Sequence, residues 1–112
     1  MELSSKTEES FRIVSVNDTR IDAAVAIEFK DAMRTQTEDG PSVVILDLSK
    51  VQFIDSSGLG AIVASMKNLG QDRKLALAGL TPTVDKVFRL TRMDSVFSLF
   101  DTLDGAVEGL RS

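Results

Sequence analysis

Hydrophobic positions along the chain alternate between the spacing of strands and the spacing of helices. Residues 11–16, Phe-Arg-Ile-Val-Ser-Val, predict a strand, and residues 1–6 are a candidate edge strand before it. From Asp22 onward, apolar residues recur every three or four positions, which predicts a helix with Asp22 at its N-cap and an end at Gly40-Pro41. The buried face of this helix is predicted to comprise Val25, Phe29, Ala32 and Met33.

The most continuous apolar run lies near the middle of the chain. Residues 43–48, Val-Val-Ile-Leu-Asp-Leu, predict a central strand that is covered on both faces. Residues 51–54 lead into Asp55-Ser56-Ser57-Gly58, after which apolar residues at helical spacing continue to Gly70. The polar tetrapeptide is therefore predicted to stand at the start of a helix.

The same alternation continues toward the C-terminus. It predicts a strand at residues 74–79, a helix that starts near Pro82, a short strand at residues 96–100 and a closing helix. Strands that alternate with helices predict an α/β fold with a mixed, mostly parallel sheet of about 4–5 strands and about four flanking helices. We expect a single domain over residues 1–112.

Composition narrows the chemistry of this fold. The 13 basic and 17 acidic residues give a net charge of −4 without a basic cluster, so we expect no direct binding to nucleic acid. The chain has no cysteine and no histidine, which excludes a Ser-His-Asp triad, thiol chemistry and metal sites built on imidazole or sulfur. We therefore expect no catalytic residue, metal or cofactor.

The N-terminal residues 1–6 lack the basic and then apolar run of a signal peptide. No apolar stretch approaches the roughly 18 residues that a membrane span needs. We expect a cytoplasmic protein without membrane insertion.

The Asp55-Ser56-Ser57-Gly58 turn is the candidate functional site. A helix N-terminus leaves about four backbone N–H groups unpaired and carries about half a positive charge, so it tolerates a phosphate on Ser56. That phosphate would add about −1.5 to −2 charges beside Asp55 and repel a partner fitted to the neutral serine. The same residues are also ordinary capping and turn chemistry, so the tetrapeptide alone decides nothing.

Glycine spacing after the serines allows two interpretations. Gly58 and Gly60 weaken a helix by about 1 kcal/mol each relative to alanine, but they let a partner's backbone approach closely. Gly58-x-Gly60 falls short of a dinucleotide fingerprint, because no third glycine follows at the required spacing.

A longer string carries a family resemblance. Residues 44–60, Val-Ile-Leu-Asp-Leu-Ser-Lys-Val-Gln-Phe-Ile-Asp-Ser-Ser-Gly-Leu-Gly, resemble the STAS domain family and, within it, the bacterial anti-sigma factor antagonists. Thr-Pro-Thr-Val at residues 81–84 and Val-Phe-Ser-Leu-Phe-Asp at residues 96–101 extend the resemblance, which covers roughly residues 10–110. It implies a β-sheet flanked by helices and a role in binding another protein.

The resemblance also implies a switch at the turn. The partner would be an anti-sigma factor that is a serine kinase, and phosphorylation of Ser56 would end the binding until a phosphatase restores the serine. Asp55 would help to place the Ser56 hydroxyl near the ATP of the kinase. The remaining contact surface would comprise Ser57, Gly58, Leu59 and Gly60.

Three positions outside the turn bear on the resemblance. The Ile21-Asp22 pair matches a family landmark, so Asp22 is either a plain N-cap or a residue that binds the kinase. Thr19 and Arg92 stand where relatives commonly have glycine.

Two other functions stay open at this point. One is a STAS adaptor in a different signalling or lipid-transport complex that is not regulated by phosphorylation. The other is an enzyme with Ser56 or Ser57 as nucleophile and a carboxylate or lysine as base, although no lysine adjoins the turn.

Overall fold

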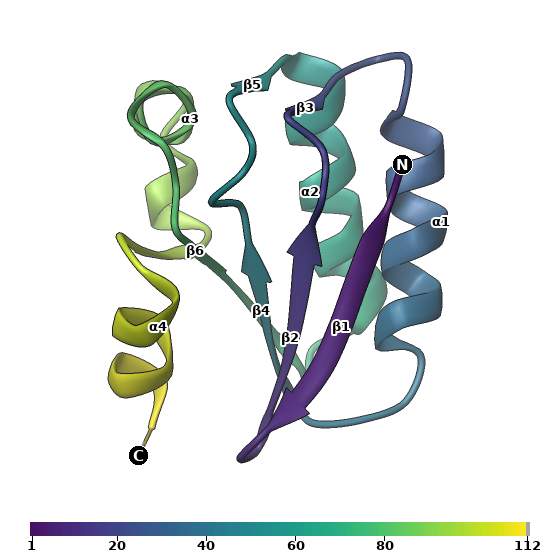
Figure 1. The fold of residues 1–112 in the computed structure, drawn as a ribbon, viewed down its shortest axis with the longest axis vertical. Helices are drawn as coiled ribbons and strands as arrows, with labels where there is room; N and C mark the ends of the chain where they lie inside the picture. Colours follow the sequence, from purple (N-terminus) through teal and green to yellow (C-terminus); the bar gives the residue numbers. More distant parts are fainter. Residues whose placement is uncertain (112) are drawn as a thin grey trace.

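The apolar runs form one five-stranded sheet in the computed structural model, which describes residues 1–111 (Figure 1). The strand order is β1-β2-β4-β6-β7, with β1 antiparallel to β2 and every other pair parallel. The predicted mostly parallel sheet and its central strand are confirmed. The bounds are Leu3–Glu8 for β1, Phe11–Val16 for β2, Val43–Asp47 for β4, Lys74–Ala78 for β6 and Ser98–Phe100 for β7.

Helices cover both faces of this sheet. On β4, Val44 and Leu46 point into the larger core with α1 and α2, whereas Ile45 packs in a smaller core with α4. Figure 1 shows α1 and α2 side by side, with α4 on the opposite side of the sheet. The bounds are Ala26–Thr37 for α1, Ser56–Leu69 for α2, Pro82–Leu90 for α3 and Leu103–Leu110 for α4, and a 3₁₀ turn η1 covers Met93–Ser95.

A second, two-stranded sheet lies beyond the carboxyl ends of β2 and β4 (Figure 1). Its strands are β3, Arg20–Ile21, and β5, Phe53–Ile54, which pair in parallel. The sequence placed residues 51–54 directly before the serine turn but did not predict their pairing with residues 20–21, because two residues carry no periodicity. This small sheet brings the loop before α1 next to the turn that starts α2.

The prediction that Asp22 is the N-cap of the first helix is wrong. Helix α1 starts at Ala26, and its N-cap, Val25, makes no side-chain capping bond. Residues 22–25 instead form a separate turn, in which the Val25 N–H donates to the Asp22 carbonyl at 3.0 Å. The Asp22 carboxylate accepts bonds from the Ala24 N–H at 3.1 Å and from Arg20 at 2.9 Å.

The first helix also ends before Gly40-Pro41, at Thr37. Two arginines from the sheet side hold its last carbonyls: Arg12 donates to the Gln36 carbonyl and Arg73 to the Thr37 carbonyl, each at 2.6 Å. Cations at a helix C-terminus also interact favourably with the helix dipole. These distant arginines fix the helix end, which local sequence signals placed too late.

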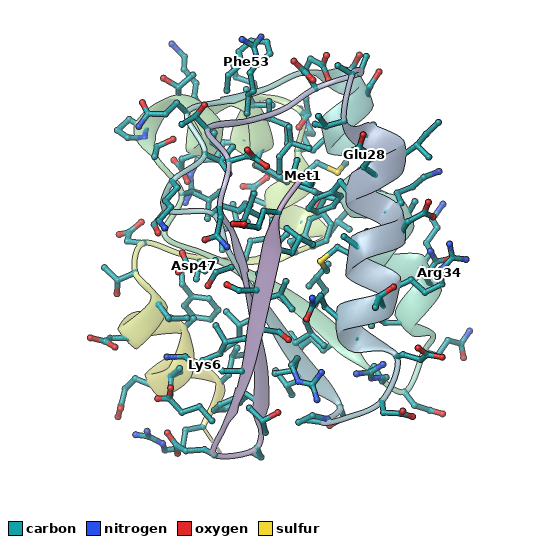
Figure 2. The ribbon with its side chains drawn as sticks, turned by 45° about the vertical axis from the view of Figure 1, so that its right-hand side comes forward. Met1, Lys6, Glu28, Arg34, Asp47 and Phe53 are labelled. Carbon is teal, nitrogen blue, oxygen red and sulfur yellow. The ribbon has the colours of Figure 1, made fainter. Side chains whose placement is uncertain are left out.

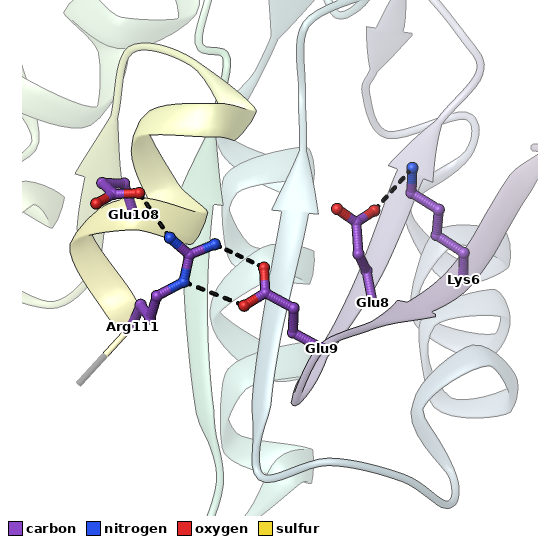
Figure 3. Close-up of polar contacts among 5 residues, drawn as sticks. All are labelled: Lys6, Glu8, Glu9, Glu108 and Arg111. Carbon is purple, nitrogen blue, oxygen red and sulfur yellow. Dashed lines mark hydrogen bonds and ion pairs between the residues drawn. The ribbon is translucent and has the colours of Figure 1, made fainter.

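Ion pairs on the surface link the residue after α4 to the turn between β1 and β2 (Figure 3). Arg111, just after α4, donates to both carboxylate oxygens of Glu9 at 3.1 and 2.7 Å and to Glu108 at 2.7 Å. Lys6 pairs with Glu8 at 3.2 Å on the same hairpin. The end of α4 is thereby tied to the β1–β2 turn.

Within residues 1–111, no helix combines the length and the apolarity needed to cross a membrane.

Candidate functional site

The serine turn begins α2, as predicted, with Asp55 as its N-cap. The Asp55 backbone is extended, with φ −105° and ψ −176°, and its carbonyl accepts the Leu59 N–H at 2.9 Å. One carboxylate oxygen accepts the Gly58 N–H at 2.8 Å, and the other accepts the Ala23 N–H at 3.1 Å. Asp55 therefore caps α2 and also ties it to the loop that precedes α1.

These hydrogen bonds stabilise the ionised form of Asp55. The Gly58 N–H, followed by that of Ala23, lowers the pKa of Asp55 below its ordinary value, although partial desolvation acts the other way. The carboxylate is ionised at neutral pH, and both of its oxygens already accept backbone bonds. Asp55 in this chain is a residue that fixes the geometry of the turn.

The two serines lie at the surface beside this cap. Ser56 and Ser57 are the first two residues of α2, and both are exposed. Leu59 is half-buried and packs against the larger core. Both serine side chains are therefore accessible from solvent, while Leu59 holds the following part of α2 against the core.

The two glycines of the segment differ in their surroundings. Gly58 is buried, and a Cβ built there would stand 2.0 Å from the Ile21 carbonyl oxygen. Gly60 is exposed, and a Cβ there would meet nothing within 4 Å. Packing inside the chain thus explains Gly58, whereas only Gly60 leaves room for another molecule.

The loop before α1 extends the surface around the serines. Asp22, half-buried, lies one residue before Ala23, whose N–H binds Asp55. Across the small sheet, the Arg20 guanidinium lies 5.0 Å from the centroid of the Phe53 ring, in the range of a cation–π contact. Phe53 is 43% exposed and lies at the end of the molecule where β3 and β5 meet (Figure 2). The structure thereby brings together residues that are about thirty positions apart.

Residues of α1 that the sequence analysis missed complete one side of the site. A shallow groove of about 260 Å³ runs between α1 and α2, and its wall includes Ser57 and Gly60. The α1 side is formed by Ala26, Ile27 and Lys30, and Ala61 also lines the groove on the α2 side. Ile27 is 71% exposed, and its position off the Phe29–Met33 stripe is the signal that could have identified it.

A second hollow, of about 390 Å³, is lined by residues of α2, β6, η1 and β7 and shares no residue with residues 55–60. Across the part of the chain that the structure describes, acidic side chains do not gather in groups able to hold a metal ion.

Comparison with known proteins decides the family. The family model described as the STAS domain matches residues 2–106. The chain belongs to the STAS domain family. This STAS domain is 31% identical over 91 residues to the anti-sigma-F factor antagonist RsfB of Mycobacterium tuberculosis, which is 81% of the chain and 75% of that relative. It is 26% identical to the anti-sigma-B factor antagonist of Staphylococcus aureus, over 81% of the chain and 84% of that relative.

The fold comparison agrees. The crystal structure of an anti-sigma factor antagonist from Mycobacterium paratuberculosis matches this STAS domain with a TM-score of 0.88 and 28% identity, over 99% of the chain and 94% of that structure. The predicted fold and the predicted resemblance to anti-sigma factor antagonists are confirmed. The roles of the individual residues in the turn stay predictions.

The backbone conformation of Arg92 bears on one departure of this STAS domain from the expected pattern. Arg92, at the position where the resemblance leads one to expect glycine, has φ 61° and ψ 25°. This left-handed region is nearly free of strain for glycine only, so Arg92 keeps a backbone shape better suited to the residue it replaces.

Proposed function

We propose that this protein is a cytoplasmic anti-sigma factor antagonist whose partner is an anti-sigma factor with serine kinase activity. Phosphorylation of Ser56 by that kinase ends the binding, and a phosphatase that acts on the phosphorylated serine restores it. The observation that carries the proposal is the exposed Ser56 at the first position of α2, directly after a cap whose carboxylate is held by two backbone N–H groups.

The geometry supports reversible modification without unfolding. Ser56 is exposed, so a kinase can reach its hydroxyl, and the N-terminus of α2 favours an added anion. The packing of the turn depends on Asp55, Gly58 and Ile21, and none of these contacts uses the Ser56 side chain. A phosphate can therefore change the surface while the fold persists.

The charge of the turn supports release of the partner. Asp55 is ionised at neutral pH, and its backbone hydrogen bonds lower its pKa further. A phosphate on the adjacent Ser56 adds about −1.5 to −2 charges, so two anionic groups then stand side by side. We propose that the partner contacts Asp22, Asp55, Ser56, Ser57, Gly58, Leu59 and Gly60, with Gly58 contributing backbone only.

The role proposed is regulatory, and no catalytic residue is assigned. The names of the curated relatives, anti-sigma factor antagonists of Mycobacterium tuberculosis and Staphylococcus aureus, support such a role. The alternative is a STAS adaptor whose binding does not depend on phosphorylation, and the following experiment distinguishes the two functions.

The test uses purified anti-sigma factor kinases from the source organism, each mixed with the wild-type chain, Ser56→Ala, Ser56→Asp and the matched neighbour Ser57→Ala. With ATP, we expect intact-mass spectrometry to show one phosphate on the wild type and on Ser57→Ala, and none on Ser56→Ala. Without ATP, calorimetry should show that Ser56→Asp binds at least about 100-fold more weakly than Ser56→Ala. Equal affinity of these two variants for the same partner would favour the adaptor instead.

A further inference from the structure

The groove between α1 and α2 continues the proposed partner surface away from Ser56. Ser57 and Gly60, two of the proposed contact residues, form part of its wall. Its volume of about 260 Å³ lies below the roughly 300–1,000 Å³ of typical small-molecule pockets. The groove therefore fits a side chain of a protein partner better than a separate ligand.

Gly60 gives the first indication that something occupies this groove. Glycine in a helix interior is less stable than alanine by about 1 kcal/mol, so an interior glycine needs a reason. Gly58 has one in the Ile21 carbonyl, whereas a Cβ on Gly60 would meet no atom of this chain within 4 Å. Gly60 also lines the groove, so the missing side chain leaves space beside it.

Ile27 gives a second, independent indication on the other wall. Phe29 and Met33, on the apolar face of α1, are buried in the core. Ile27 is 71% exposed and lines the groove. A lone exposed isoleucine is common and signifies little. Together with Ala26 and Ala61, however, Ile27 makes part of the wall of a concave site apolar, while Lys30 and Ser57 supply its polar part.

Lys30 supplies the charge of the site. It lines the groove one helical turn after Ala26, and it takes part in none of the ion pairs formed within residues 1–111. A partly apolar groove with one cation in its lining is complementary to an aliphatic side chain next to a carboxylate.

We propose that this groove holds an aliphatic side chain of the anti-sigma factor, and that a neighbouring carboxylate of the same partner pairs with Lys30. The inference rests on the proposed function and extends it, because it explains how one phosphate disturbs a wider interface. Ser57 lines the groove, so a phosphate on the adjacent Ser56 brings negative charge to its end and repels the partner's carboxylate.

The first experiment uses the anti-sigma factor that binds the wild-type chain and not Ser56→Asp. Ile27→Ser is compared with Leu90→Ser, since Leu90 is exposed to a similar extent, 74%, but lies on α3. We expect Ile27→Ser to weaken binding at least about tenfold and Leu90→Ser to leave it unchanged. Lys30→Glu should weaken binding more at low than at high salt. Gly60→Ala should weaken binding while the denaturation midpoint stays the same or rises.

A labelling experiment reports on the groove directly. The chain has no cysteine, so Ile27→Cys and Leu90→Cys each accept one environment-sensitive fluorophore. On addition of the same anti-sigma factor, we expect a blue shift for the label at residue 27 and no shift for the label at residue 90.

The outcomes separate the two proposals. Wild-type affinity in Ile27→Ser and Gly60→Ala, together with loss of binding in Ser56→Asp, overturns the groove and leaves the switch at Ser56 intact. If every anti-sigma factor that binds the wild type also binds Ser56→Asp equally well, both proposals are overturned.

Discussion

Gly58 lies so close to the carbonyl oxygen of Ile21 that a Cβ on Gly58 would stand 2.0 Å from it. This contact seats the first turn of α2 directly on the small β3–β5 sheet, where Ile21 pairs with Ile54. The loop that contains Asp22 and the turn that contains Ser56 are thereby held as one surface.

Gly58→Ala should therefore destabilise the protein. No Cβ can occupy a position 2.0 Å from a backbone oxygen, so α2 or β3 must move, and we expect a loss of at least about 2 kcal/mol in the free energy of unfolding. Urea denaturation followed by circular dichroism measures it. Gly60→Ala, in open space, is the matched control and should gain about 0.5–1 kcal/mol. Similar midpoints for the two variants would contradict the close contact.

The capping carboxylate predicts a dependence of stability on pH. The folded state lowers the pKa of Asp55 below its unfolded value near 3.8, chiefly through the Gly58 N–H. The contribution of Asp55 to stability is thus fully present above that unfolded value and is lost as the pH falls through the lower folded pKa. We expect Asp55→Asn to unfold at lower urea concentration than the wild type at pH 7, and this difference to shrink in acid.

Asp101→Asn is the control for that series, because Asp101 is an exposed aspartate outside the turn. Asp101→Asn should unfold at the same urea concentration as the wild type, both at pH 7 and in acid. A difference between the wild type and Asp55→Asn that stayed constant down to pH 2 would show that the charge of Asp55 does not stabilise the cap.

The left-handed backbone of Arg92 predicts a stabilising substitution. Arg92→Gly relieves the strain of a side chain at φ 61°, but it also increases the entropy of the unfolded chain, so we expect a net gain of about 0.5–1 kcal/mol. Thermal and urea denaturation measure it. Arg92→Ala retains the Cβ and should show no such gain; an equal gain in both variants would assign the effect to the arginine side chain instead.

The sequence predicted those parts of the fold and site that depend on neighbouring residues. The pattern of apolar residues located the strand at residues 43–48 and the helix after Asp55. Such a pattern shows which faces of a local element are buried. It misplaced the start of α1, because the Asp22 carboxylate binds Ala24 and Arg20 instead of the helix N-terminus. It also credited both glycines to a partner, although the structure gives Gly58 an internal cause.

Sequence alone therefore determined the alternating α/β order, the position of Ser56 directly after a capping aspartate, and the absence of histidine and cysteine. These follow from residue type and short-range spacing. Only the tertiary structure decided that Asp55 bonds Ala23, 32 residues away, and that Ile27 and Gly60 face a common groove. Such contacts depend on how two helices pack on one sheet. No local pattern in the sequence specifies which residues from distant segments come together there.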